Sequence, residues 1–274
     1  MSNIVVRTLT GIIIVVAILG SIVLGKYYFG ALFLIFTILG AFEFFQMLEK
    51  SEIIAQKYFG TVLASILYTL LFLVAIKAIS AMYLIAVVLL VFVIPIRELY
   101  RTDSNIPLPN IATTLFGIVY VAVPFGLMNF MFYYGSVGEK TETFHLLFAF
   151  FVILWTSDTF AYLTGTKFGK NRLFKRISPK KSWEGSIGGA IFALFAAFLF
   201  SLWFTEMNLS LWLGYAMVIV VAGTYGDLVE SMFKRSLFLK DSGNILPGHG
   251  GILDRFDAVF LAVPAAILYL MIIS

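Results

Sequence analysis

Long apolar segments alternate with short polar ones along most of the chain. Nine of them approach the roughly 20 apolar residues that a helix needs to cross a bilayer. Their ranges are 8–25, 28–48, 58–76, 78–96, 111–135, 144–166, 185–204, 209–233 and 256–274. Little more than Lys77 separates the third from the fourth, which predicts a tight helical hairpin there. The pattern predicts an all-α, polytopic integral membrane protein with about nine transmembrane helices.

The composition supports this fold class and excludes some chemistry. Of 274 residues, 61% are hydrophobic and 12% are charged, whereas a soluble domain is about 45–50% apolar and about 25% charged. The chain has no cysteine, which excludes thiolate nucleophiles, disulfides and cysteine-based metal sites. The first apolar segment follows Arg7 and lacks a small-residue cleavage site, so we expect an anchor and not a cleaved signal peptide.

The basic residues are distributed very unequally between the two sides that nine spans define. Sixteen of the 19 lysines and arginines fall on the side of the N-terminus, and only Lys26, Lys77 and Lys140 fall on the other. Cytoplasmic loops carry such an excess of lysine and arginine. We therefore expect a cytoplasmic N-terminus and a multi-pass protein of the cell inner (plasma) membrane.

Acidic side chains within or near the spans are the first candidates for function. They are Glu43, Asp158, Asp227 and Glu230, and the pair Asp254 and Asp257 lies at the start of the last span. A charged side chain at the centre of a transmembrane helix costs about 2.5–3.5 kcal/mol on insertion scales, so it is expected to face protein, water or a cation. We expect the acids of the sixth, eighth and ninth spans to converge on the cytoplasmic side.

Carboxylates without thiols suit hard cations, above all Mg²⁺. This ion takes one or two protein carboxylates and completes its shell with waters and phosphates. Seven basic residues lie in 167–181 and four more in 234–255, where they could hold phosphates. Acids for a metal and bases for phosphate at a membrane surface predict phosphoryl or nucleotidyl transfer.

A transporter or cation channel is the main alternative, because intramembrane acids also mark ion pathways. It predicts inverted repeats, which the hydropathy does not show, and it leaves the basic loops unexplained.

Three polar motifs accompany the acids. "PGHGG" at 247–251 holds three glycines, which permit positive φ and close approach of backbone N–H groups to an anion. In "SPKKSWEG" at 178–185, Ser178-Pro179 is interpreted as a helix start, which places Lys180, Lys181 and Ser182 near a phosphate-binding helix N-terminus. Glu184 is expected to pair with a lysine or to reach the metal. "WTSDTFAYLTGTKFGKN" at 155–171 and "GSIGGA" at 185–190 supply small residues for helix packing.

The run "SMFKRSLFLKDSGNILPGHGGILDRFD" at 231–257 resembles the C-terminal signature of the phosphatidate cytidylyltransferases, also called CDP-diacylglycerol synthases. "SPKKSWEG" and "SDTFAYLTGTKFGK" also resemble stretches of that family, whereas the first 140 residues carry no specific motif. The resemblance implies transfer of CMP from CTP to phosphatidate, giving CDP-diacylglycerol and pyrophosphate, with Mg²⁺. It implies region 1–140 as N-terminal transmembrane helices and region 141–274 as the catalytic region. A CTP-dependent lipid kinase, or transfer to another lipid phosphate, is the alternative within enzymes.

If the chain transfers CMP from CTP to phosphatidate, each candidate residue can be assigned an expected role. The expected catalytic residues are Asp227, Asp254, Lys240, Asp241 and Arg255. The expected metal ligands are Asp227, Asp254, Asp257 and Asp158, for one Mg²⁺ or for Mg²⁺ and a second cation. The expected phosphate-binding residues are Lys180, Lys181, Ser182, Lys234, Arg235, His249, Gly250 and Gly251. His249 either contacts a phosphate or braces its loop.

The expected partners are CTP, phosphatidate and membrane lipid, with no nucleic acid. The resemblance also allows a homodimer, and the active site is expected to face the cytoplasm.

The remaining charges receive structural interpretations. Glu43 is expected to be a buried hydrogen-bonding group, with a place in the cavity wall as the alternative. His145 is expected at the membrane interface. Glu98 and Glu206 are expected to be solvated loop charges.

Overall fold

The structure is a computed structural model, and it describes residues 3–49, 53–102, 106–133, 143–243, 245 and 250–274. The chain forms two compact units. The first comprises Met1–Phe130 and Leu237–Phe256, and the second comprises Met131–Ser236 and Asp257–Ser274. The signature at 231–257 therefore contributes residues to both units, whereas the predicted regions 1–140 and 141–274 follow chain order.

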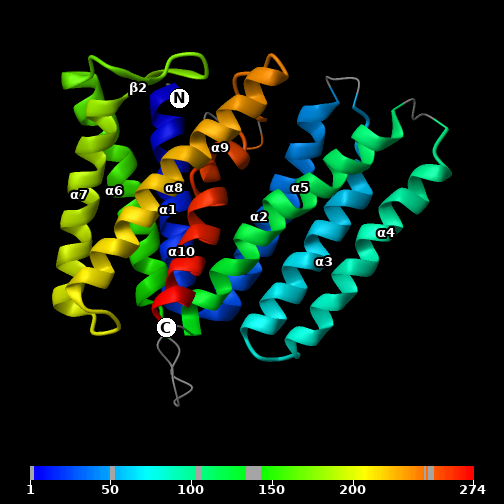
Figure 1. Ribbon diagram of the computed structural model, residues 1–274, viewed down its shortest axis with the longest axis horizontal. Coiled ribbons are helices and arrows are strands. Elements are labelled where there is room, and N and C mark those ends of the chain that lie inside the picture. The colour runs from blue at the N-terminus through cyan, green and yellow to red at the C-terminus, as the bar shows by residue number, and fades with distance from the viewer. Residues whose placement is uncertain (1–2, 50–52, 103–105, 134–142, 244, 246–249) are drawn as a thin grey trace. The chain divides into compact units, whose positions relative to one another are not determined.

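Helices are the regular elements of the first unit in its described residues (Figure 1). Its elements are α1 (Asn3–Leu24), α2 (Lys26–Leu48), α3 (Lys57–Ala75), η1 (Ala81–Leu84), α4 (Ile85–Leu99), α5 (Pro107–Met128) and α9 (Leu253–Phe256), and η2 (Asn129–Tyr133) crosses into the second unit. α2, α3 and α5 pack against one another. Lys77 follows α3 with a φ of 59°, which confirms the tight turn predicted there.

Aromatic side chains form the core of this unit. Phe33 of α2, Phe125 of α5 and Phe256 of α9 meet with ring centroids 5.1–5.8 Å apart. All three are at most 4% exposed. Edge-to-face pairs at such distances stabilise beyond the area they bury. The aromatic cluster fixes the end of the 237–256 segment against α2 and α5.

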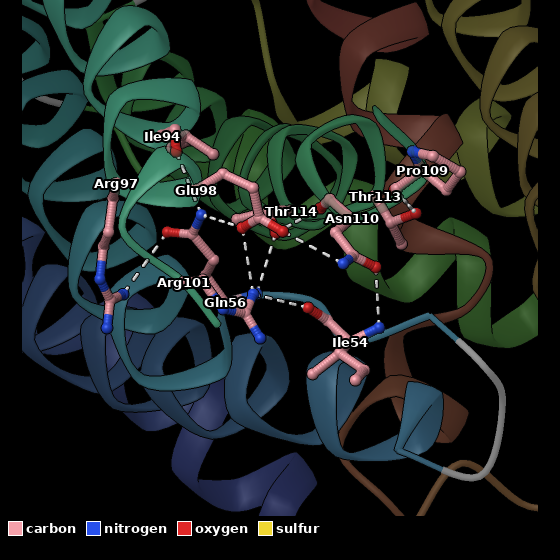
Figure 2. Close-up of polar contacts among 10 residues, drawn as sticks. All are labelled: Ile54, Gln56, Ile94, Arg97, Glu98, Arg101, Pro109, Asn110, Thr113 and Thr114. Carbon is pink, nitrogen blue, oxygen red and sulfur yellow. Dashed lines mark hydrogen bonds and ion pairs between the residues drawn. The ribbon is translucent and has the colours of Figure 1, made fainter. Parts of the chain in front are cut away.

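A polar network joins the ends of α3, α4 and α5 in the first unit (Figure 2). Glu98 is 4% exposed and accepts hydrogen bonds from Gln56 Nε2 at 2.7 Å, Asn110 Nδ2 at 3.1 Å and Arg101 at 3.1 Å. The prediction of a solvated loop charge was wrong for Glu98. The side chain lies in the last turn of α4, and its donors come from α5, from Arg101 and from the residue before α3. Gln56 and Asn110 lie 42 and 12 residues from Glu98 along the chain, so the local sequence does not indicate the burial of Glu98.

In the residues that the structure describes, the second unit contains four long helices and one small sheet. Its elements are α6 (His145–Phe168), β1 (Arg172–Phe174), β2 (Ser178–Ser182), α7 (Trp183–Trp203), α8 (Leu209–Ser236) and α10 (Val259–Ile273). α6 packs against α7, α7 against α8, and α8 against α10. The carboxylate of Glu206 contacts Nδ1 of His145, and the side chain of Glu206 is 11% exposed. Its prediction as a solvated charge was therefore also wrong.

The β1–β2 hairpin corrects the predicted start of α7. Ser178 and Pro179 lie in a strand, and β2 pairs antiparallel with β1. The helix begins at Trp183, after Ser182, whose hydroxyl accepts a hydrogen bond from the backbone of Gly185. Ser182 is the N-cap because its side chain satisfies a helix donor that lacks an intrahelical partner. Lys180 and Lys181 thus precede the helix and belong to the strand.

Eight helices in the described residues are long and apolar enough to cross a membrane, by length and composition. A shorter apolar helix, Thr8–Leu24, lies near the N-terminus. The predicted polytopic α-helical class is confirmed, and the total of nine spans stays a prediction. α8 continues to Ser236, so Lys234 and Arg235 lie in its last turn and not in a loop.

Candidate active site

Asp227 and Lys181 form an ion pair within the second unit. Their Oδ2 and Nζ atoms are 2.6 Å apart, and the two side chains are 30% and 28% exposed, respectively. Ser231, one turn later on α8, donates a hydrogen bond to Oδ1 of Asp227 at 3.1 Å. Both members of the pair are partly open to their surroundings. An arriving cation or phosphate can therefore compete for either of them.

Two further carboxylates surround this pair. Asp158 on α6 lies within electrostatic range of both Lys181 and Asp227. Asp257 lies within range of Asp158, Asp227 and Glu230. The predicted convergence of acids from the sixth, eighth and ninth spans is therefore present in the second unit for Asp158, Asp227 and Asp257.

Close backbone packing brings these carboxylates together. A Cβ added at Gly226, next to Asp227, would lie 2.7 Å from the carbonyl oxygen of Asp257. A Cβ at Gly189 of α7 would lie 2.6 Å from the carbonyl oxygen of Ser157, which precedes Asp158. Distances below about 3.0 Å force the backbone to shift. Glycine is needed at both positions, and "GSIGGA" serves helix packing as predicted.

Glu230 and Lys234 form an ion pair with each other. Their Oε1 and Nζ atoms are 3.1 Å apart along α8, and both side chains are at most 10% exposed. The spacing of four residues places them on one helical face. Lys234 remains a predicted phosphate ligand, but it would have to give up this buried partner to bind one.

Glu184 has a role that the sequence did not predict. Its carboxylate accepts hydrogen bonds from the backbone N–H groups of Lys170 and Asn171 at 3.1 Å, and from Asn171 Nδ2 at 2.8 Å. It therefore ties the segment before β1 to the first turn of α7. Backbone and amide donors thus engage both of its oxygens, and the expectation that it would pair with a lysine or reach the metal stays a prediction.

A second carboxylate cluster lies in the first unit and is closed. Glu43 of α2 is 1% exposed and accepts hydrogen bonds from the backbone N–H groups of Ile252 at 2.9 Å and Leu253 at 3.1 Å. The hydroxyl of Ser242 also contacts Glu43, across 199 positions of sequence. Glu43 is thus the buried hydrogen-bonding group that the sequence favoured. It holds the N-terminal end of α9.

Asp254 belongs to the same closed cluster. Its Oδ2 accepts hydrogen bonds from Ser242 N and Ser242 Oγ, both at 2.9 Å, and from Gly251 N at 3.0 Å. Ser242 was not singled out from the sequence, because a serine in a polar loop carries no signal of a carboxylate so distant in the chain. Asp254 stays a predicted metal ligand, with Oδ2 already engaged by its own loop.

The motif "PGHGG" was predicted to permit positive φ and a close approach of the backbone to an anion. Gly250 has a φ of +82°, and a Cβ at Gly251 would collide with Oε1 of Glu43. The backbone therefore does approach an anion closely. That anion is an internal carboxylate, so phosphate binding by Gly250 and Gly251 stays a prediction.

The remaining predicted residues differ in exposure, and one of them lies outside the described part. Exposed positions are Lys180, Arg235, Lys240, Asp241 and Arg255. Ser182 is buried as the cap of α7. His249 lies outside the described residues.

The donors of the second unit fit a hard cation bound together with phosphate. Among the described residues, no group of three or more acidic or histidine side chains is placed to hold a metal ion by itself. Mg²⁺ needs only one or two protein carboxylates when substrate phosphates complete its shell. Asp227 and Asp158 offer these oxygens, and the ammonium of Lys181 at 2.6 Å shows that a cation is stabilised beside Asp227.

These features define a multi-pass α-helical membrane protein with a charged site of carboxylates from α6 and α8 and a lysine from β2. The family model described as "Cytidylyltransferase family" matches residues 5–273. The chain therefore belongs to the cytidylyltransferase family.

The chain is also similar to curated proteins that are named phosphatidate cytidylyltransferase. The chain is 43% identical over 155 residues to the phosphatidate cytidylyltransferase of Staphylococcus aureus (strain COL), which is 56% of this chain and 56% of that protein. It is 41% identical over 155 residues to the phosphatidate cytidylyltransferase of Staphylococcus haemolyticus (strain JCSC1435), with the same coverage of both chains. The matched part thus spans little more than half the length of these relatives.

Proposed function

We propose that the chain transfers CMP from CTP to phosphatidate, giving CDP-diacylglycerol and pyrophosphate at the cytoplasmic face of the inner (plasma) membrane. Membership of the cytidylyltransferase family and the names of the relatives support the reaction class. The observation that carries the proposal is the half-open Asp227–Lys181 pair beside Asp158. It combines a carboxylate for a cation with an ammonium for a phosphate.

The reaction needs positioning more than proton transfer. A phosphate oxygen of phosphatidate attacks the α-phosphorus of CTP, a new P–O bond forms, and the bond to the pyrophosphate oxygen breaks. The lipid phosphate is already ionised near neutral pH, so no strong general base is required. Charge neutralisation and alignment then supply most of the rate.

In this scheme Lys181 exchanges Asp227 for a phosphate oxygen when substrate binds. Lys180 precedes it on β2 and is exposed, so it can bind a second phosphate. Asp227 and Asp158 would hold Mg²⁺, which would supply positive charge against the phosphates and the departing pyrophosphate. Asp257 is the next carboxylate candidate. The signature adds Asp254, Lys240, Asp241 and Arg255 to the residues proposed for catalysis.

The test uses detergent-solubilised full-length protein with phosphatidate, Mg²⁺ and CTP labelled either at the α- or at the γ-phosphate. The proposal predicts label in the lipid product from α-labelled CTP and label in pyrophosphate from γ-labelled CTP. Lipid labelled only from γ-labelled CTP would identify a lipid kinase instead. No labelled lipid from either form, across several phosphatidates, would contradict the proposal.

A further inference from the structure

The β1–β2 hairpin connects the ends of two candidate membrane spans. α6 ends at Phe168 and α7 begins at Trp183, and both helices qualify as spans by length and composition. The hairpin lies beyond these helix ends in Figure 1, where β2 is labelled. Between two such spans, a polar, basic segment of this length is expected at the membrane surface.

The hairpin is rigidly attached at its base. Glu184 holds the backbone of Lys170 and Asn171, and Trp183 N donates to Asn171 O at 2.9 Å. The turn closes with Ile177 N donating to Phe174 O at 3.3 Å, and Ile177 is 8% exposed. The tip is therefore presented in a fixed orientation.

Its outer surface combines cations with an exposed aromatic ring. Lys175 and Arg176 are exposed in the turn, and Phe174 beside them is 45% exposed. Arg172 lies two residues before Phe174 on β1 and is exposed as well. The segment 167–183 contains seven lysines and arginines and no acidic residue.

We propose that this hairpin is an interfacial docking element that binds anionic phospholipid headgroups. Phe174 inserts at the boundary of the acyl chains, and Arg172, Lys175 and Arg176 contact headgroup phosphates. The commitment to a lipid surface rests on charge complementarity and on the continuity of the hairpin with two spans. A basic segment flanked by exposed aromatic side chains has the composition of elements that lie in the interface plane.

The docking element would enrich the anionic lipid substrate near the Asp227–Lys181 pair, which is connected to it through β2. This consequence rests on the proposed function. The docking itself does not, and the two are measured separately.

The depth of position 174 in the bilayer tests the proposed docking. Because the chain has no cysteine, Phe174→Cys provides a unique site for a spin label on full-length protein in lipid nanodiscs. In bilayers with phosphatidylglycerol, we expect the label to be more accessible to oxygen than to a polar nickel chelate. Adding Lys175→Gln and Arg176→Gln should weaken the association about 30-fold and return the label to water. Equal accessibility to the polar chelate in neutral and anionic bilayers would overturn the proposal.

Two controls separate headgroups from other causes. Inorganic phosphate added to neutral bilayers should leave the depth of the label unchanged, and a shift by phosphate alone would contradict docking to a lipid surface. Lys26→Gln with Lys77→Gln removes the same charge from the side predicted to be opposite, and should not move the label. Movement with these substitutions would mean that net charge alone is responsible.

The kinetic arm uses mixed micelles in which the surface fraction of phosphatidate is varied. Lys175→Gln with Arg176→Gln should raise the KM for phosphatidate by up to about 30-fold, with kcat and the KM for CTP within about twofold of the parent. An unchanged lipid KM would contradict substrate enrichment. If the parent protein forms no CDP-diacylglycerol, the proposed function fails while the depth measurement still decides the docking.

Discussion

The two carboxylate clusters of this protein differ in what satisfies their charge. In the first unit, Glu43 and Asp254 accept hydrogen bonds from backbone N–H groups and from Ser242. In the second unit, Asp227 is paired with Lys181 and both side chains are about one third exposed. Fixed backbone donors cannot leave, whereas a flexible lysine can exchange its partner. We therefore expect Glu43 to support the fold and the Asp227–Lys181 pair to remain available to a ligand.

The Glu98 network extends this contrast. Its donors are side chains, yet the carboxylate is 4% exposed and is held by three residues from separate parts of the first unit. Glu98 is buried and accepts several hydrogen bonds, so we assign it a structural role. It nevertheless has a basic partner, Arg101, just as Asp227 has Lys181. A basic partner alone therefore does not distinguish a working carboxylate from a structural one.

Asp227→Asn should have the largest effect and should separate the two clusters most clearly. The amide keeps the size of the side chain but loses the charge that pairs with Lys181 and would bind a cation. We expect CDP-diacylglycerol formation to fall about 10²–10³-fold. The thermal midpoint of the purified protein should change by only a few degrees, because the site is half open. A variant with parental turnover would remove Asp227 from the site.

Glu98→Ala should produce the opposite pattern. It leaves Arg101, Gln56 and Asn110 with unsatisfied donors in a buried place, which costs about 3 kcal/mol. Denaturant unfolding should show this loss, while the rate per folded molecule remains near that of the parent. Glu49→Ala is the matched control, since Glu49 pairs with Lys57 but is 57% exposed and should cost less than about 1 kcal/mol. Equal losses for both variants would contradict the assignment.

Glu43→Gln should show how far the closed cluster supports the fold. The amide presents an N–H group to one of the backbone donors of Ile252 or Leu253, which loses a charge-assisted hydrogen bond worth about 2 kcal/mol. Unfolding experiments should detect that change. Glu43→Asp, which keeps the charge, should recover part of the loss. If Glu43→Gln were as stable as the parent, the hydrogen bonds to α9 would not be important for the fold.

Ser182→Ala should have the smallest effect of the four. The substitution removes the hydroxyl that caps α7, which costs about 1 kcal/mol. Ser182→Thr keeps the oxygen and should restore most of the stability, measured by denaturant unfolding. A loss of activity far beyond this change in stability would indicate that Ser182 also contacts a phosphate, as its motif predicts.

The sequence predicted the class of fold well because hydropathy directly measures the cost of placing polar groups in a bilayer. The convergence of Asp158, Asp227 and Asp257 was predicted for the same reason, since intramembrane acids need partners. The start of α7 was not predicted, because Pro179 suits a helix start and a strand equally until the pairing with β1 is known. Ser242 and the burial of Glu98 were missed, because their partners lie far away in the sequence.

The contrast between an open and a closed carboxylate is tested most directly by measuring Asp227→Asn and Glu98→Ala side by side. For each, the initial rate of CDP-diacylglycerol formation is divided by the fraction of folded protein, and unfolding is followed on the same preparation. We predict a rate per folded molecule reduced about 10²–10³-fold for Asp227→Asn with little loss of stability. For Glu98→Ala we predict a nearly unchanged rate with a stability loss of about 3 kcal/mol. The reverse result, or the same result for both, would contradict the division of roles.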